Sequence, residues 1–251
     1  MIRGEDLIVA NIEEPDFGFI DPNKPEARNM IALLSKQTFK TLDTFQLERF
    51  EVANCILQID KKVSGVIGQG SSHRNQSSTF VIIGTAFIDE ETMPSRGRLL
   101  IFKVNAQECK FDLIHEKQAP GSIQALATMK ENHKYLILGI NNRIIVYSLN
   151  LRYGDHFEIE AHDSKVSGTF TQCIKTIDFQ IVVGDIMKGI IVFDLKEGRQ
   201  GKISLVEGPS SCQMNIWVNE ILILSKTKYM VLDKEKNIFI FQRNLKPANE
   251  I

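Results

Sequence analysis

Three side chains in the middle of the sequence could together perform acid–base chemistry. His156 and His162 are six residues apart, a spacing that places both on one face of a β-strand. Asp185 follows Gly184 at the end of an apolar run and could supply a carboxylate to the pair. The alternative is that both histidines are exposed edge residues and that Asp185 accepts hydrogen bonds from turn amides. We favour the alternative, because a metal pair normally brings a third ligand with it.

Other signatures of catalysis or nucleotide binding are missing from the sequence. It contains no HExxH, GxSxG, P-loop or GxGxxG motif. The glycine and serine residues within 61–78 predict a surface loop, since no third glycine and no helix follow Gly68 and Gly70. The four cysteines are widely spaced, which predicts reduced thiols in an intracellular protein: Cys55, Cys109, Cys173 and Cys212. We therefore expect no enzyme activity, no metal and no cofactor.

The charge balance argues against a nucleic-acid interface that covers the whole chain. The 251 residues carry 30 Lys and Arg against 31 Asp and Glu, a formal net charge of −1, whereas nucleic-acid-binding proteins usually have a basic excess. A loose basic string could form a local patch, although a solvated face is the default interpretation: Arg96, Arg98, Lys103 and Lys110. No apolar run approaches the roughly 20 residues that span a bilayer, so we expect no membrane partner.

A repeated strand–turn–strand pattern must position any of these side chains. The aromatic residue that ends each second strand recurs after 45, 46 and 48 residues: Phe102, Tyr147, Phe193 and Phe241. A period in the forties indicates a repeat architecture, and the Val- and Ile-rich runs favour buried strands. Three of the copies end their first strand on a glycine, where a bulge or a tight backbone leaves no room for a Cβ: Gly84, Gly139 and Gly184.

Two weaker strands follow each hairpin, for example within 109–118 and 121–129. Four strands per period are typical of a β-propeller blade. We predict an all-β fold, a partial β-propeller of about four to five four-stranded blades. Its blades would cover 28–244, with an edge strand or weakly structured segment before them and a short tail, 245–251. We expect an open arc in which the strand near Met30 is not paired with the strand near Phe239. A rival fold has two α+β domains, with a helix over 125–134.

The glycine hairpins resemble a known family. Residues 79–104 and 174–193 are similar to two segments of the carboxy-terminal region shared by the large subunits of damaged-DNA-binding protein and of the cleavage and polyadenylation specificity factor. The matching residues include the adjacent pair Gly84 and Thr85 in the first segment and the adjacent pair Gly184 and Asp185 in the second. It covers roughly 28–243 and implies the third, seven-bladed propeller of much longer proteins, so part of that ring is missing from this chain.

The resemblance implies a non-catalytic scaffold or adaptor in a nuclear complex of DNA repair, ubiquitin ligation or RNA processing, with the cytoplasm as a second location. It implies protein partners that dock a short helix, and nucleic-acid association at the level of the family. The matching positions are Glu91, Thr92, Ser122, Gln124, Phe170, Gln172, Ile186 and Lys188.

Phe170 and Ile186 would form an apolar floor, and Glu91 and Lys188 oppositely charged rims. In the other interpretation Phe170 and Ile186 belong to the core. Two alternative functions stay open: direct nucleic-acid binding through the basic string, and a propeller hydrolase or lyase that uses Asp185. The oligomeric state is unknown.

Overall fold

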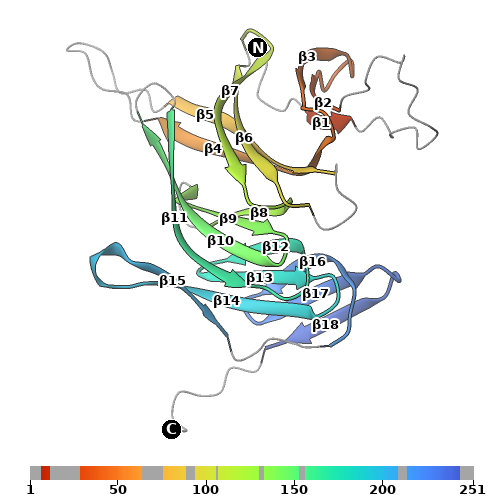
Figure 1. Ribbon diagram of the computed structural model, residues 1–251, viewed down its shortest axis with the longest axis vertical. Coiled ribbons are helices and arrows are strands. Elements are labelled where there is room, and N and C mark those ends of the chain that lie inside the picture. Colours follow the sequence, from red (N-terminus) through yellow and green to blue (C-terminus); the bar gives the residue numbers. More distant parts are fainter. Residues whose placement is uncertain are drawn as a thin grey trace, which may run out of the picture. The chain divides into compact units, whose positions relative to one another are not determined.

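The computed structural model describes residues 7–11, 29–63, 76–88, 94–105, 107–129, 133–152, 156–208 and 214–243 (Figure 1). Within these ranges the chain forms strands β1 to β18 and one short 3-10 turn, Arg199–Gly201, between β14 and β15. The strands build five separate sheets, three with four strands and two with three. This arrangement confirms the predicted all-β, partial β-propeller fold. None of the described segments is a helix that is long and apolar enough to cross a membrane.

The first two sheets lie in the amino-terminal half of the sequence. One sheet contains β1 (Leu7–Asn11), β2 (Met30–Leu34) and β3 (Thr41–Gln46). The next contains β4 (Glu51–Val63), β5 (Gln76–Phe87), β6 (Gly97–Asn105) and β7 (Lys110–Ala119). The pairings within both sheets are antiparallel.

The remaining three sheets follow in sequence. The third contains β8 (Ile123–Met129), β9 (Tyr135–Ile140), β10 (Arg143–Arg152) and β11 (His156–Val166). The fourth contains β12 (Thr171–Ile177), β13 (Gln180–Asp185), β14 (Gly189–Glu197) and β15 (Ile203–Glu207). The fifth contains β16 (Val218–Ser225), β17 (Lys228–Asp233) and β18 (Ile238–Gln242).

The four repeats of the sequence are the hairpins β5–β6, β9–β10, β13–β14 and β17–β18. Residues 123–129 form strand β8 with alternating burial, so the rival helix over 125–134 is wrong. In the described residues β2 pairs with β1 and β3, and β18 pairs with β17. The open arc expected between the strand that contains Met30 and the strand that contains Phe239 stays a prediction.

The chain divides into two compact units. Unit 1 contains residues 1–123 and 151–157, and unit 2 contains residues 124–150 and 158–251. In unit 1 the sheet with β2 packs face to face on the sheet with β5 and β6, through Ile31, Leu33, Val81 and Phe102 among others. The ring of Phe102 meets that of Phe45 edge to face, with their centroids 5.1 Å apart.

In unit 2 the sheet β12–β15 is buried on both faces. Ile181 and Val183 pack with residues of β8, β9 and β10, whereas Val182 packs with residues of β16 and β17. This explains why the apolar run of β13 has no polar alternation: successive side chains point to opposite faces, and both faces are covered.

Glycines at the ends of the first hairpin strands let the next sheet approach closely. A Cβ on Gly84 would lie 2.4 Å from Cγ2 of Ile123, and one on Gly184 would lie 2.6 Å from Cγ1 of Val218. One on Gly139 would lie 2.5 Å from a side-chain carbon of β12. A register shift accompanies the pairing of Gly84 and of Gly184 with the preceding strand. The expectation of a bulge or tight backbone is thus confirmed at these two positions.

Candidate docking face in unit 2

The carboxylate of Asp185 holds two loops of unit 2 together. Its Oδ2 accepts hydrogen bonds from the backbone N–H groups of Thr169 and Phe170, at 2.6 and 2.8 Å. Its Oδ1 accepts from the N–H groups of Met187 and Lys188, at 2.9 and 2.8 Å. The side chain is fully buried, and all four donors are backbone amides. Asp185 therefore has the turn-bracing role that the sequence predicts.

The two histidines make contacts of their own. The ring centroid of His162 lies 6.2 Å from that of Tyr135, and the centroid of His156 lies 6.3 Å from that of His115. Burial is the main cause that lowers the pKa of His115, which favours the neutral ring. Among the described residues no hydrogen bond joins either predicted histidine to Asp185, which is occupied by backbone amides.

Four of the eight residues predicted to bind a partner come together beside Asp185. The N–H of Ile186 donates to the carbonyl oxygen of Phe170 at 3.0 Å, which places the two side chains on adjacent loops. Both are half-buried, so each combines a packed part with an accessible part. Gln172 is half-buried at the start of β12, and Lys188 is exposed.

The other four predicted positions lie elsewhere or cannot be placed. Gln124 is half-buried at the start of β8, in unit 2. Ser122 belongs to unit 1, where it is buried and its Oγ accepts a hydrogen bond from Nδ2 of Asn54 at 2.9 Å. Glu91 and Thr92 lie outside the described residues, as do most of the Gly- and Ser-rich loop and the tail 245–251.

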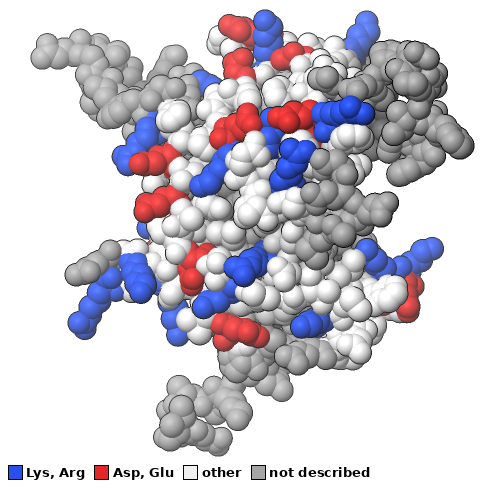
Figure 2. Space-filling view, in the orientation of Figure 1, with Lys and Arg blue, Asp and Glu red and all other residues white. Residues whose placement is uncertain are grey.

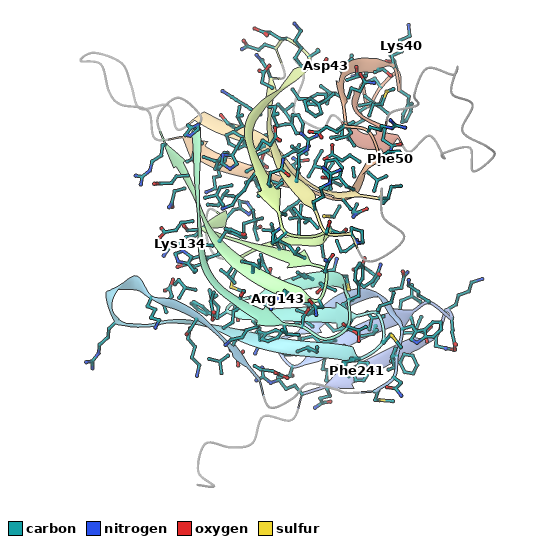
Figure 3. The ribbon with its side chains drawn as sticks, viewed as in Figure 1. Lys40, Asp43, Phe50, Lys134, Arg143 and Phe241 are labelled. Carbon is teal, nitrogen blue, oxygen red and sulfur yellow. The ribbon has the colours of Figure 1, made fainter. Side chains whose placement is uncertain are left out.

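The β9–β10 turn adjoins the loop that precedes β12. The carbonyl oxygen of Asn142 accepts from the N–H of Ser167 at 2.8 Å, and that of Asn141 accepts from the N–H of Thr171 at 2.7 Å. Asn141 has a φ of 50°, in the left-handed region that asparagine tolerates better than most residues. The exposed Arg143 follows this turn (Figure 3).

The loops at the start of β16 and after β17 continue the same end of unit 2. The carbonyl oxygen of Trp217 accepts from the N–H of Lys234 at 2.9 Å. The next residue, Val218, packs against Gly184, which directly precedes Asp185. We call the loops 141–143, 167–170, 186–188, 214–217 and 234–236 together the loop face.

The loop face contains residues that the sequence did not single out as a binding site. Three apolar side chains are about half-exposed there: Met187 and Met214, each 50%, and Trp217, 52%. Arg143, Lys234 and Lys236 are exposed on the same loops. The sequence did contain a local clue to this surface, because each of these residues lies within a few positions of the end of a predicted strand.

In unit 1 the structure corrects the interpretation of the basic string. Arg98 is 5% exposed, and its guanidinium forms hydrogen bonds with the buried carboxylate of Glu51. It also pairs with Glu48 and Glu116, each at 3.0 Å, and Thr85 Oγ1 donates to Glu51 at 2.6 Å. Burial opposes the charge, but the hydrogen bonds to Glu51 and Glu116 raise the pKa of Arg98. The prediction that Arg98 belongs to a solvated face is wrong, and the candidate nucleic-acid patch loses this residue.

Two of the cysteines that the structure describes have shielded thiols. Cys55, Cys109 and Cys173 form no disulfide. Burial raises the pKa of both Cys55 and Cys173 to about 12, which suppresses the reactive thiolate. Within the described ranges no group of three or more His, Cys, Asp or Glu side chains could hold a metal ion.

Comparison with known proteins assigns the chain to a family. The sequence model described as the CPSF A subunit region matches residues 28–251. The chain belongs to the CPSF A subunit region family. This match confirms the resemblance drawn from the glycine hairpins.

Curated relatives of the chain include DNA damage-binding protein 1 of Oryza sativa subsp. japonica, 28% identical over 88% of this chain and 18% of the relative. DNA damage-binding protein 1b of Arabidopsis thaliana is 27% identical over 91% of this chain and 20% of the relative. Protein CFT1 of Kluyveromyces lactis is 21% identical over 95% of this chain and 18% of the relative. The chain thus spans about a fifth of the length of these relatives.

Proposed function

We propose that this chain is a non-catalytic docking module that binds other proteins as a scaffold or adaptor. The observation that carries the proposal is the loop face, where loops from three sheets of unit 2 join half-exposed apolar side chains to exposed cations. The carboxylate of Asp185 holds two of these loops together through hydrogen bonds to their backbone amides, which we call the Asp185 clamp. The surface is therefore pre-organised for binding.

The setting that we propose is a nuclear complex in DNA repair, including ubiquitin ligation, or in RNA processing. The names of relatives support this setting, since they refer to DNA damage binding and, in the probable cleavage and polyadenylation specificity factor subunit 1 of Oryza sativa subsp. japonica, to cleavage and polyadenylation. A fluorescent fusion of the chain should accumulate in the nucleus. Exclusion of the fusion from the nucleus would contradict the proposed setting.

The proposed mode of binding is a short partner helix that lies on the loop face. Phe170 and Ile186 would form the apolar floor of the contact, and Lys188 and Gln172 would supply polar groups beside it. Such a helix would present apolar anchors one and two turns apart, which is the usual pattern of helix recognition by a groove.

The test is the double variant Ile186→Asp with Phe170→Ala, scored by affinity purification with quantitative mass spectrometry and by thermal melting. We expect specific partners to be lost while the melting temperature stays close to that of the wild type. The matched control is Leu113→Asp, which places a carboxylate at a 36% exposed position of unit 1 and should leave the partners bound. An unchanged set of partners with an intact fold would remove this surface.

If the double variant unfolds, Met187→Asp replaces it. That side chain is 50% exposed, so a carboxylate there stays solvated and the fold should hold. Loss of partners in this variant would support the loop face, and full retention would contradict it.

A further inference from the structure

The loop face has an excess of positive charge. Five exposed cations lie on or immediately beside its loops: Arg143, Lys165, Lys188, Lys234 and Lys236. Lys165 belongs to the end of β11, two residues before Ser167, whose N–H is bonded to the β9–β10 turn. Within the described part of unit 2, none of these five cations forms an ion pair.

The acidic residues on the same loops do not offset this charge. Asp185 is buried, and its oxygens are occupied by four backbone N–H groups. Asp233 is 6% exposed and accepts hydrogen bonds from the backbone and the side chain of Asn237. Glu235 is the one exposed carboxylate on the described loops of this face.

The loops at the other ends of these strands are different. Lys134, which precedes β9, pairs with Glu197 at 3.4 Å, and Lys226, in the β16–β17 turn, pairs with Asp178 at 2.5 Å. Figure 3 shows Lys134 and Arg143 at opposite ends of the β9–β10 hairpin. Two cations at that end of the strands are thus paired with carboxylates, whereas none of the five at the loop face forms an ion pair within the described residues. In Figure 2, by contrast, Lys and Arg side chains lie beside Asp and Glu side chains over much of the visible surface.

The apolar side chains of the loop face distinguish between two kinds of negatively charged partner, a nucleic acid and an acidic protein segment. Trp217, Met187 and Met214 are each about half-exposed, and Ile186 lies between the two loops fixed by Asp185. Trp217 is the one planar ring among these four side chains, whereas sites for single-stranded nucleic acid stack successive bases on several aromatic rings. An apolar centre with a cationic border suits a helix with apolar anchors and acidic flanks, since opposite potentials steer and orient a partner.

We propose that the loop face binds an acidic amphipathic helix of a partner protein, with its apolar side on Ile186, Met187 and Trp217 and its carboxylates toward the surrounding cations. This inference rests on the proposed function, because it names the chemistry of the partner that the docking surface accepts. It adds a preference for charge sign, which the proposed function does not require.

The probe is a synthetic helical peptide with Leu on one face and Glu on the other positions, compared with its Lys counterpart. Trp217 is the only tryptophan of the sequence, so its emission reports binding at the site directly. We expect a blue shift with the Glu peptide, saturable binding, and an affinity that falls as salt rises. The Lys peptide should bind at least about tenfold more weakly, because like charges then face each other.

Charge reversal at the loop face tests the same point on the protein side. Lys188→Glu with Lys234→Glu should raise the Kd of the Glu peptide by about tenfold or more and improve binding of the Lys peptide. The matched control is Lys196→Glu with Lys202→Glu, two exposed lysines near the β14–β15 turn with the same change in net charge. This control should shift the Kd by less than about threefold, because screening limits charges at a distance. Circular dichroism and melting check that all four lysine substitutions leave the fold intact.

Three results would overturn the inference: equal binding of the Glu and Lys peptides, equal effects of the two charge reversals, or tighter binding of a single-stranded oligonucleotide that displaces the Glu peptide. Partner loss in the Ile186 and Phe170 double variant, together with any of these results, would leave the proposed docking function in place and remove only the acidic preference. Intact partners in that variant together with selective binding of the Glu peptide would instead refute the docking mode proposed above.

Discussion

The guanidinium of Arg98 lies against the carboxylate of Glu51 in the interior of unit 1, where the two side chains are 6% and 0% exposed. The strands that carry them are separated in the sheet by β5, whose Thr85 donates a hydrogen bond to Glu51. Such a pair stabilises a fold only as long as both members are present, because each compensates the desolvation of the other.

Arg98→Met should lower the free energy of unfolding by about 3–5 kcal/mol, since it leaves the Glu51 carboxylate buried without its guanidinium. Urea titration followed by circular dichroism measures the change. Arg98→Met combined with Glu51→Leu should recover part of the loss, because no charge then stays buried. As a control, Glu116→Gln removes a 38% exposed partner of Arg98 and should change stability by less than about 1 kcal/mol. A loss in Arg98→Met no larger than in Glu116→Gln would contradict the buried pair.

Gly184→Ala should destabilise unit 2. The new Cβ would lie 2.6 Å from Val218 Cγ1 and 2.7 Å from Cys173 Sγ, so neighbouring strands would have to move apart. Overpacking of this kind costs about 1–3 kcal/mol, measured as a lower urea midpoint. Gly198→Ala is the matched control, because the nearest atom would be 3.4 Å away, and it should stay within about 0.5 kcal/mol. Equal stability of the two variants would show that the sheets are not held this close.

Asp185→Ala should cost about 3 kcal/mol or more, because four backbone N–H groups lose a charged acceptor. Hydrogen exchange should then accelerate at the amides of Thr169, Phe170, Met187 and Lys188. Asp178→Asn is the control, since it removes the charge from a surface ion pair, keeps a side chain that tolerates the positive φ of 51° at this position, and should have little effect. Unchanged exchange at the four amides would refute the clamp.

Two thiols should resist alkylation: that of the buried Cys173, and that of the half-buried Cys55, which donates to the backbone carbonyl oxygens of Gly84 and Ile123. With a pKa raised to about 12 by burial, Cys55 and Cys173 are ionised to about one part in ten thousand at pH 8. Iodoacetamide at pH 8 should therefore modify Cys109, which lies half-buried in the turn after β6, before it modifies Cys55 or Cys173. Peptide mass spectrometry gives the order, and urea should abolish the difference. Modification of Cys55 or Cys173 ahead of Cys109 in the folded protein would contradict the buried environment.

The sequence by itself was sufficient for the repeat and for the fold class. The strands of each hairpin are adjacent in sequence, and their composition and turns are local signals, so the period in the forties implied a propeller without any knowledge of contacts. The role of Asp185 was accessible for the same reason, since two of its four amide donors follow it within three residues.

Only the tertiary structure decided the environment of individual side chains. In the sequence, Arg98 is one cation of a loose basic string. In the structure it is buried, because Glu51, which lies 47 residues away in the sequence, is its partner across the sheet. Likewise, Arg143, Lys188 and Lys234 belong to different sheets and share no local pattern. They meet because loops at the same ends of successive sheets are joined by backbone hydrogen bonds and close packing. Burial and charge pairing depend on neighbours that are remote in sequence, and a linear pattern records only the neighbours along the chain.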